Sequence, residues 1–118
     1  MEKLPLEFNG RAEVSGVTFY QLYRHEMLCL YRRVEPEGGE NYEVIRAIEN
    51  EEADGVIGGV KVHFAAKETY PKAERWGATE RGTTSLSKAI DYFNQSCKYM
   101  EYPFTLTQEM LHGAAILS

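Results

Sequence analysis

The sequence predicts an α+β domain: a three- to four-stranded antiparallel meander, one main amphipathic helix packed across one face, and a short C-terminal helix. Three observations support this fold class. Residues 60–66 place apolar side chains at every second position, which is the period of a half-buried strand. Pro- and Gly-containing loops separate the β-rich runs, as is typical of hairpins. An apolar stripe at helical spacing is formed by Leu86, Ala89, Ile90 and Phe93.

Length and composition indicate a single folded domain over residues 1–118. The 8 Tyr, 5 Phe and 1 Trp exclude a disordered composition. The N-terminal residues combine charges with Pro5 where a signal peptide needs an apolar run, and no apolar window is long enough to span a membrane. We therefore expect a cytoplasmic protein without membrane contact, whose Cys29 and Cys97 are buried free thiols.

The N-terminal residues 1–16 fit a short edge strand, with a mobile arm as the alternative. Leu4, Leu6 and Phe8 occupy alternate positions, which favours a strand. The following Asn9–Gly10 is a turn dipeptide. The strand interpretation would place this segment beside the meander.

Residues 17–34 have two interpretations, one long helix or two strands. A helix is indicated by a heptad-like spacing of 3, 4, 3 and 4 between Tyr20, Tyr23, Met27, Leu30 and Val34. Two strands, 17–24 and 27–34, are indicated by the β-branched and aromatic residues throughout and by a break near His25–Glu26. The segments that follow favour the two strands.

The next segments complete the predicted meander. Residues 35–41 combine a proline, a glycine pair and acids, which predicts a loop, and residues 42–48 are strand-like. Residues 50–59 form a second loop, acidic and then glycine-rich, before the strand that starts at Val60. Tyr70–Pro71 ends that strand, because proline has no N–H to donate to a sheet.

The main helix and a tail make up the C-terminal part. Hydroxyl side chains at positions 83–85 offer an N-cap for a helix that runs to about Lys98. The tail, residues 99–118, contains a proline and then Thr107, which can cap a short last helix over residues 108–117.

Five short segments carry a resemblance to other proteins. They are residues 27–33, residues 42–46, Tyr70–Pro71, Trp76–Gly77 and residues 84–89. Their order resembles that in a loose group of small proteins from phages and other bacterial mobile elements, and the likeness covers residues 17–97. It implies a strand meander followed by a capped helix, and it assigns no role to any residue. The chain departs from the group at residues 78–82, which lack a second aromatic residue, and in its tail.

Motifs for catalysis or metal binding are not found in the sequence. His25, His63 and His112 lie in no spacing that brings two metal ligands onto one element. A Gly-x-Ser-x-Gly nucleophile motif is lacking, and Cys29 between two leucines fits a core position. We expect a non-catalytic protein without metal or cofactor.

Charge placement supports a protein-interaction module as the first hypothesis. The net charge is −5, and residues 35–54 hold eight acids against Arg46 alone, so this stretch carries −7 and the rest +2. Acids on loops would attract a basic protein partner, such as a host protein bound by a mobile-element protein. The candidate partner-binding residues are Glu35, Glu37, Glu40, Glu49, Glu51, Glu52 and Asp54.

The alternative hypothesis is nucleic-acid binding on a face of the sheet. Aromatic rings beside arginines can stack on bases and follow a phosphate backbone. Core packing explains the same tyrosines, and the acidic loops would repel a polyanion, so a nucleic-acid partner is less favoured than a protein. No sequence feature sets the oligomeric state. The residues of this alternative face are Tyr20, Tyr23, Arg24, Tyr31, Arg32 and Arg33.

Overall fold

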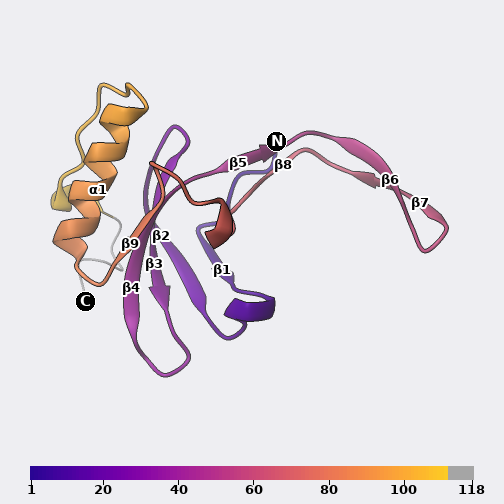
Figure 1. Cartoon of the computed structure of the whole chain (residues 1–118), viewed down its shortest axis with the longest axis horizontal. Coiled ribbons are helices and arrows are strands. Elements are labelled where there is room, and N and C mark those ends of the chain that lie inside the picture. The colour runs from indigo at the N-terminus through magenta and orange to yellow at the C-terminus, as the bar shows by residue number, and fades with distance from the viewer. Residues whose placement is uncertain (112–118) are drawn as a thin grey trace.

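The computed structural model describes residues 1–111 and confirms an α+β protein with an antiparallel sheet and one main helix. Five strands form the main sheet in the order β1-β2-β3-β4-β9, and helix α1 (Leu86–Tyr99) packs on one face (Figure 1). The strands are β1 (Glu7–Asn9), β2 (Thr18–His25), β3 (Leu28–Val34), β4 (Glu40–Arg46) and β9 (Arg81–Thr83). No helix in the described part of the chain is long and apolar enough to cross a membrane.

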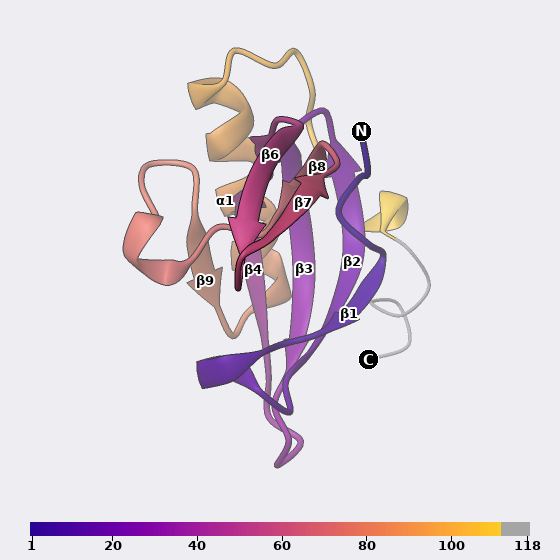
Figure 2. The same ribbon diagram turned by 90° about the vertical axis from the view of Figure 1, so that its right-hand side faces the viewer.

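Residues 48–69 form a long two-stranded hairpin, called the arm from here on. β5 (Ile48–Asn50) pairs with β8 (Lys67–Thr69) at its root, and β6 (Ala53–Ile57) pairs with β7 (Val60–Phe64) toward its tip. The arm extends from the side of the sheet opposite to α1 (Figures 1 and 2). Three 3₁₀ turns complete the described elements: η1 (Ala12–Val14), η2 (Ala73–Arg75) and η3 (Gln108–Met110).

Residues 18–34 form two strands, which confirms the two-strand interpretation and rules out a continuous helix. β2 and β3 pair in antiparallel register and are joined by a tight turn. Glu26 in that turn has a φ of 52°, in the left-handed region that a helix interior excludes. The break therefore falls where the sequence places it.

A β-bulge at Leu22 explains the helix-like spacing of three between Tyr20 and Tyr23. Tyr20 pairs with Arg32, and Tyr23 pairs with Leu30, so three positions on β2 correspond to two on β3. Cross-strand partners point to the same face, and residues two apart on β3 also share a face. Tyr20 and Tyr23 therefore lie on the same face of the sheet although an odd number of positions separates them.

The sheet has an apolar core on each face. The helix-side core lies between the sheet and α1, and the opposite-side core lies between the sheet and the N-terminal segment. The helix-side core includes Leu22, Leu28, Leu30, Val44, Ala89, Phe93 and Cys97. The opposite-side core includes Leu4, Val17, Phe19, Cys29, Tyr31, Ile45 and Ala47. The central strand β3 is therefore covered on both sides.

Helix α1 begins and packs as the sequence predicts. The Ser85 side chain accepts a hydrogen bond of 3.2 Å from the backbone N–H of Lys88, which satisfies one of the free donors at the helix N-terminus. Ala89 and Phe93 are fully buried, and the other two stripe residues are half-buried against the same core. The predicted apolar stripe is thus the sheet-facing side of the helix.

The two cysteines are buried and free, as predicted. Cys29 lies in the opposite-side core and Cys97 in the helix-side core, so the sheet separates them. Burial raises the pKa of Cys29 to about 12 and also raises that of Cys97. Both side chains are therefore protonated thiols near neutral pH, which is not the state of a nucleophilic cysteine.

The predicted meander differs from the observed sheet on its later strands. Val60–Phe64 was expected to be a half-buried strand of the main sheet, but it is strand β7 of the arm, and the fourth and fifth places are filled by β9 and β1. Residues 50–59 were expected to be a loop, but they contain β6. Alternation specifies that one side of a strand is apolar and does not specify which element covers it.

The predicted C-terminal helix is seen only as a short turn within the described residues. Its first part is the 3₁₀ turn η3, which follows Thr107. Leu111, just after that turn, is buried in the helix-side core. Residues 112–117 of the predicted helix lie outside the described residues.

Candidate functional site

The arm is a ribbon with one apolar face. Its tip is a two-residue turn at Gly58 and Gly59, both with positive φ, and the paired strands alternate their side chains between two faces. Cross-strand partners share a face, so the register separates an apolar set from a polar set. The apolar face carries Ala53, Gly55, Ile57, Val60, Val62 and Phe64. The polar face carries Asp54, Val56, Lys61 and His63.

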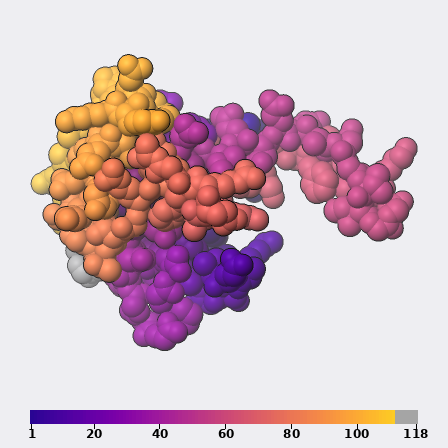
Figure 3. Space-filling model, viewed as in Figure 1, coloured from indigo at the N-terminus to yellow at the C-terminus, as the bar shows by residue number. Residues whose placement is uncertain are grey.

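The apolar face is uncovered in the isolated chain. The exposed fractions of Ile57, Val60 and Phe64 are 61%, 63% and 47%. The Phe64 ring lies over Gly55, where an added Cβ would come within 3.1 Å of the ring. In the space-filling view the arm stands clear of the body along β6 and β7 (Figure 3). Large apolar side chains are thus presented to solvent on a projecting element.

The polar face carries a histidine between two carboxylates. His63 Nδ1 lies 2.7 Å from Asp54 Oδ1, and His63 Nε2 lies 3.1 Å from Glu52 Oε1. The two carboxylates approach opposite nitrogens of the ring, so the three side chains do not converge on one point. Within residues 1–111, no group of three or more such side chains is placed to hold a metal ion.

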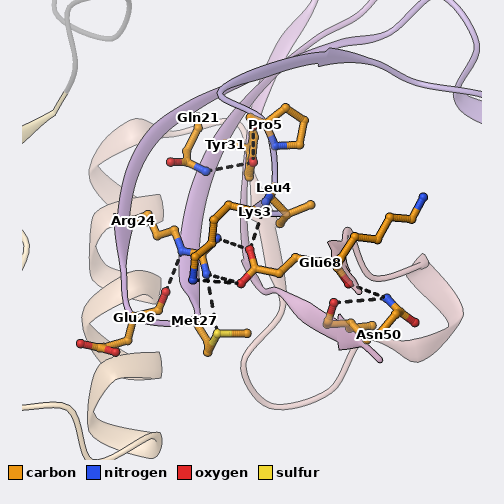
Figure 4. Close-up of polar contacts among 12 residues, drawn as sticks. Lys3, Leu4, Pro5, Gln21, Arg24, Glu26, Met27, Tyr31, Asn50 and Glu68 are labelled. Carbon is orange, nitrogen blue, oxygen red and sulfur yellow. Dashed lines mark hydrogen bonds and ion pairs between the residues drawn. The ribbon is translucent and has the colours of Figure 1, made fainter. Parts of the chain in front are cut away.

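Glu68 fixes the root of the arm to the body (Figure 4). Its buried carboxylate accepts two hydrogen bonds from Arg24 on β2, at 2.5 and 2.7 Å, and one of 3.0 Å from the backbone N–H of Leu4. Lys3 lies 3.6 Å from the same carboxylate. One side chain therefore joins the arm, the main sheet and the N-terminal segment.

Glu68 should make the stability of the protein depend on pH in the acidic range. Hydrogen bonds from Arg24 hold the pKa of Glu68 at about 2, below its ordinary value of 4.5. A lowered carboxyl pKa adds stability that is complete above the unfolded-state pKa and is lost as pH falls through the folded-state pKa. We expect thermal unfolding to show this loss between about pH 4.5 and about pH 2. A Glu68→Gln variant should lack this component, and an identical pH profile for both proteins would contradict the assignment.

A recess of about 900 Å³ lies beside the root of the arm, on the side of the sheet opposite to α1. Its walls come from the N-terminal segment, the sheet and residues 69–76, and they include Phe8, Val14, Tyr70 and Trp76. The buried Glu43 at the sheet accepts a hydrogen bond of 2.7 Å from the Tyr70 hydroxyl. Burial, together with the negative charge of Glu43, raises the pKa of Tyr70. The Tyr70 hydroxyl is therefore a neutral hydrogen-bond donor to Glu43.

The seven predicted acidic residues lie in two separate places. Glu35, Glu37 and Glu40 are at or beside the β3–β4 turn, where Glu35 accepts from Arg33 at 2.7 Å and Glu40 pairs with Arg32. The other four acidic residues lie on the arm. They belong to β5, to β6 and to the short connection between these strands, where the sequence predicted a loop. The turn and the arm lie at distant parts of the molecule (Figure 1). The acids therefore do not form one patch.

The six residues of the alternative nucleic-acid face divide between both sides of the sheet. The register places Tyr20, Tyr23 and Arg32 on the helix side, and Arg24, Tyr31 and Arg33 on the opposite side. Tyr31 is fully buried, and its hydroxyl donates to the Pro5 carbonyl at 2.7 Å. The three arginines pair with glutamates. These residues therefore do not share one exposed surface.

Two features of the site are absent from the sequence-based prediction. The exposure of the arm's apolar face has no sequence signal, because burial by another element gives the same alternation. The sequence does contain a sign that Glu68 is buried, because Glu68 occupies the next even-numbered position after the apolar residues from Val60 to Ala66. A charged residue in an apolar phase points inward and needs a partner. Its partners Arg24 and Leu4 lie 44 and 64 positions away, so only the fold identifies them.

No protein-family model, curated protein or solved structure matches this chain.

Proposed function

We propose that this protein is a non-catalytic protein-interaction module and that the arm is its binding element. The observation that carries the proposal is the uncovered apolar face of the arm, with Ile57, Val60 and Phe64 largely exposed. Contiguous exposed apolar side chains are typical of interaction sites, because water contact with them is unfavourable. An isolated two-stranded hairpin is also marginally stable, so a partner that covers the face would stabilise the arm.

The charges of the arm add an electrostatic component to this proposal. Glu49, Glu51, Glu52 and Asp54 are all exposed along one strand of the arm and its connection. Such acids speed association with a surface that carries basic groups, and their effect weakens as salt shortens the Debye length to about 8 Å. The resemblance to mobile-element proteins supports a phage or mobile-element origin and a basic host protein as one such partner.

Nucleic-acid binding on the sheet has less support. The six residues of that alternative lie on both faces. Arg24 donates two hydrogen bonds to the buried Glu68, and Arg33 contacts both Glu35 and Glu43. A phosphate would have to compete with these carboxylates for the guanidinium groups.

Site-specific photocrosslinking tests the proposal. A photoreactive amino acid in place of Ile57 samples the apolar face, and the same group in place of Val56 samples the polar face at the same end of the arm. Val56 is 66% exposed and Ile57 61%, so the two sites are matched in accessibility. In a native cell extract we expect adducts from position 57 and few from position 56, because the apolar face is the contact. Equal labelling from both positions, or none from 57, would rule out the arm as the binding element.

A further inference from the structure

We infer that the arm binds a second copy of this chain, with the two arms antiparallel and the tip of each arm seated in the recess of the other copy. This inference rests on the proposed function and names the partner of the same site. The apolar tip and the apolar-walled recess are both present on one molecule. Each therefore offers a surface of the kind that the other needs.

The positions of tip and recess fit a two-fold symmetric pair. Thr69 and Tyr70 line the recess and directly follow β8, so the recess lies at the root of the arm, while Ile57 and Val60 lie at its far end. In a two-fold dimer, a contact from tip to root in one direction is repeated in the other. Antiparallel arms meet this condition, because the tip of each arm then reaches the root of its partner.

The charges along the arm favour the antiparallel arrangement. Lys61 belongs to the second cross-strand pair counted from the tip, and Glu49 belongs to the second pair counted from the root. If the tip of one arm reaches the root of the other, the positive charge of Lys61, on the polar face beside the apolar contact, comes near the negative charge of Glu49 of the partner subunit. Parallel arms would instead place acidic stretches against each other, which is unfavourable. The rim of the recess carries both signs, with Arg11, Lys72, Glu13 and Glu74.

The area required for a stable dimer favours insertion over face-to-face stacking. Five residues of ribbon are about 17 Å long and two strands about 10 Å wide, so one face offers roughly 170 Å². Stable interfaces bury about 800 Å² on each partner. Reciprocal insertion covers the face and edges of each arm and the walls of each recess, and it makes the contact twice. The face of one ribbon is too small for a stable interface. Reciprocal insertion buries the recess walls and the arm edges in addition to that face.

Sedimentation of the purified protein over a range of concentrations tests the inference. We expect a monomer–dimer equilibrium in the parent, and a dissociation constant about 100-fold higher in Ile57→Asp, because the contact is lost twice per dimer. Val56→Asp is the matched control on the other face and should weaken the dimer far less than Ile57→Asp, because it removes no apolar contact and only adds an acid beside its pair partner Lys61. Ala73→Arg, at the exposed recess wall, should weaken the dimer without touching the arm. Circular dichroism would verify that all variants are folded.

A charge exchange tests the antiparallel register. Lys61→Glu should weaken the dimer, and the double variant Lys61→Glu with Glu49→Lys should restore it, because the attraction returns with reversed signs. If Ile57→Asp and Val56→Asp act equally, or Ala73→Arg has no effect, the arrangement is overturned. A parent protein that is monomeric up to its solubility limit also overturns it. The proposed function would then stand only if position 57 crosslinks to a different protein, and it would fall as well if no adduct forms.

Discussion

Replacing Phe93 by alanine is expected to lower the free energy of unfolding by about 3–5 kcal/mol, because a fully buried aromatic side chain leaves a cavity when truncated. Phe93 is 0% exposed and belongs to the helix-side core. Its ring makes edge contacts with Tyr23 on β2 and with Phe104 after the helix, at centroid distances of 6.3 and 6.4 Å. One side chain therefore joins the sheet, the helix and the segment that follows.

Chemical denaturation of the variant and the parent measures this loss. Tyr99→Ala is the matched control, since it truncates an aromatic residue on the same helix that is 65% exposed. A surface change of this kind should stay within about 0.5 kcal/mol. Equal unfolding midpoints for Phe93→Ala and the parent would show that α1 does not pack on the sheet through this residue.

Replacing Glu68 by glutamine is expected to cost about 3–5 kcal/mol, which is typical when one partner of a buried ion pair is removed. The Glu68 side chain is 0% exposed and that of Arg24 is 16% exposed, so the guanidinium would lose its anion in a poorly solvated site. The backbone N–H of Leu4 would lose a charged acceptor at the same time. We also expect faster amide exchange at β5 and β8, because the root of the arm loses its side-chain contact with β2 and keeps only the backbone hydrogen bonds to Glu2.

Glu51→Gln provides the comparison for this variant. Glu51 is exposed on the same arm, and the substitution removes one carboxylate charge in the same way. Denaturant unfolding should show little change, and exchange at β8 should match the parent. If Glu68→Gln behaves like Glu51→Gln, the contact with Arg24 does not hold the arm.

Local patterns in the sequence predicted α1 and the strands β2 and β3. The cap at Ser85 and the stripe around Phe93 identify α1, because both signals lie within a few turns of the same helix. The break near Glu26 separates β2 from β3, because a turn in the left-handed region interrupts the pattern locally. The heptad-like spacing was misleading, because the bulge at Leu22 brings Tyr20 and Tyr23 to one face and Met27 packs on the opposite side of the sheet from Leu30. No helix was needed to explain it.

The sequence patterns did not predict where the elements lie relative to one another in the folded protein. Val60–Phe64 has the alternation of a half-buried strand, yet the structure leaves its apolar side uncovered on the arm. β9 was missed because three residues, Arg81–Thr83, are too few to show a period. The acidic residues were identified as charges, but their separation between a turn and the arm depends on contacts distant in sequence.

The two-glycine turn at the tip of the arm constrains how this chain can change by insertion and deletion. Both glycines adopt positive φ, which other residues adopt rarely, and this fixes the pairing of Ile57 with Val60. One residue gained or lost within a strand exchanges the apolar and charged faces of everything beyond it. Descendants of this sequence can therefore lengthen or shorten the arm and keep its surface only in steps of two residues on each strand. Arm length in related chains should vary in such steps, while the glycine pair remains at the tip.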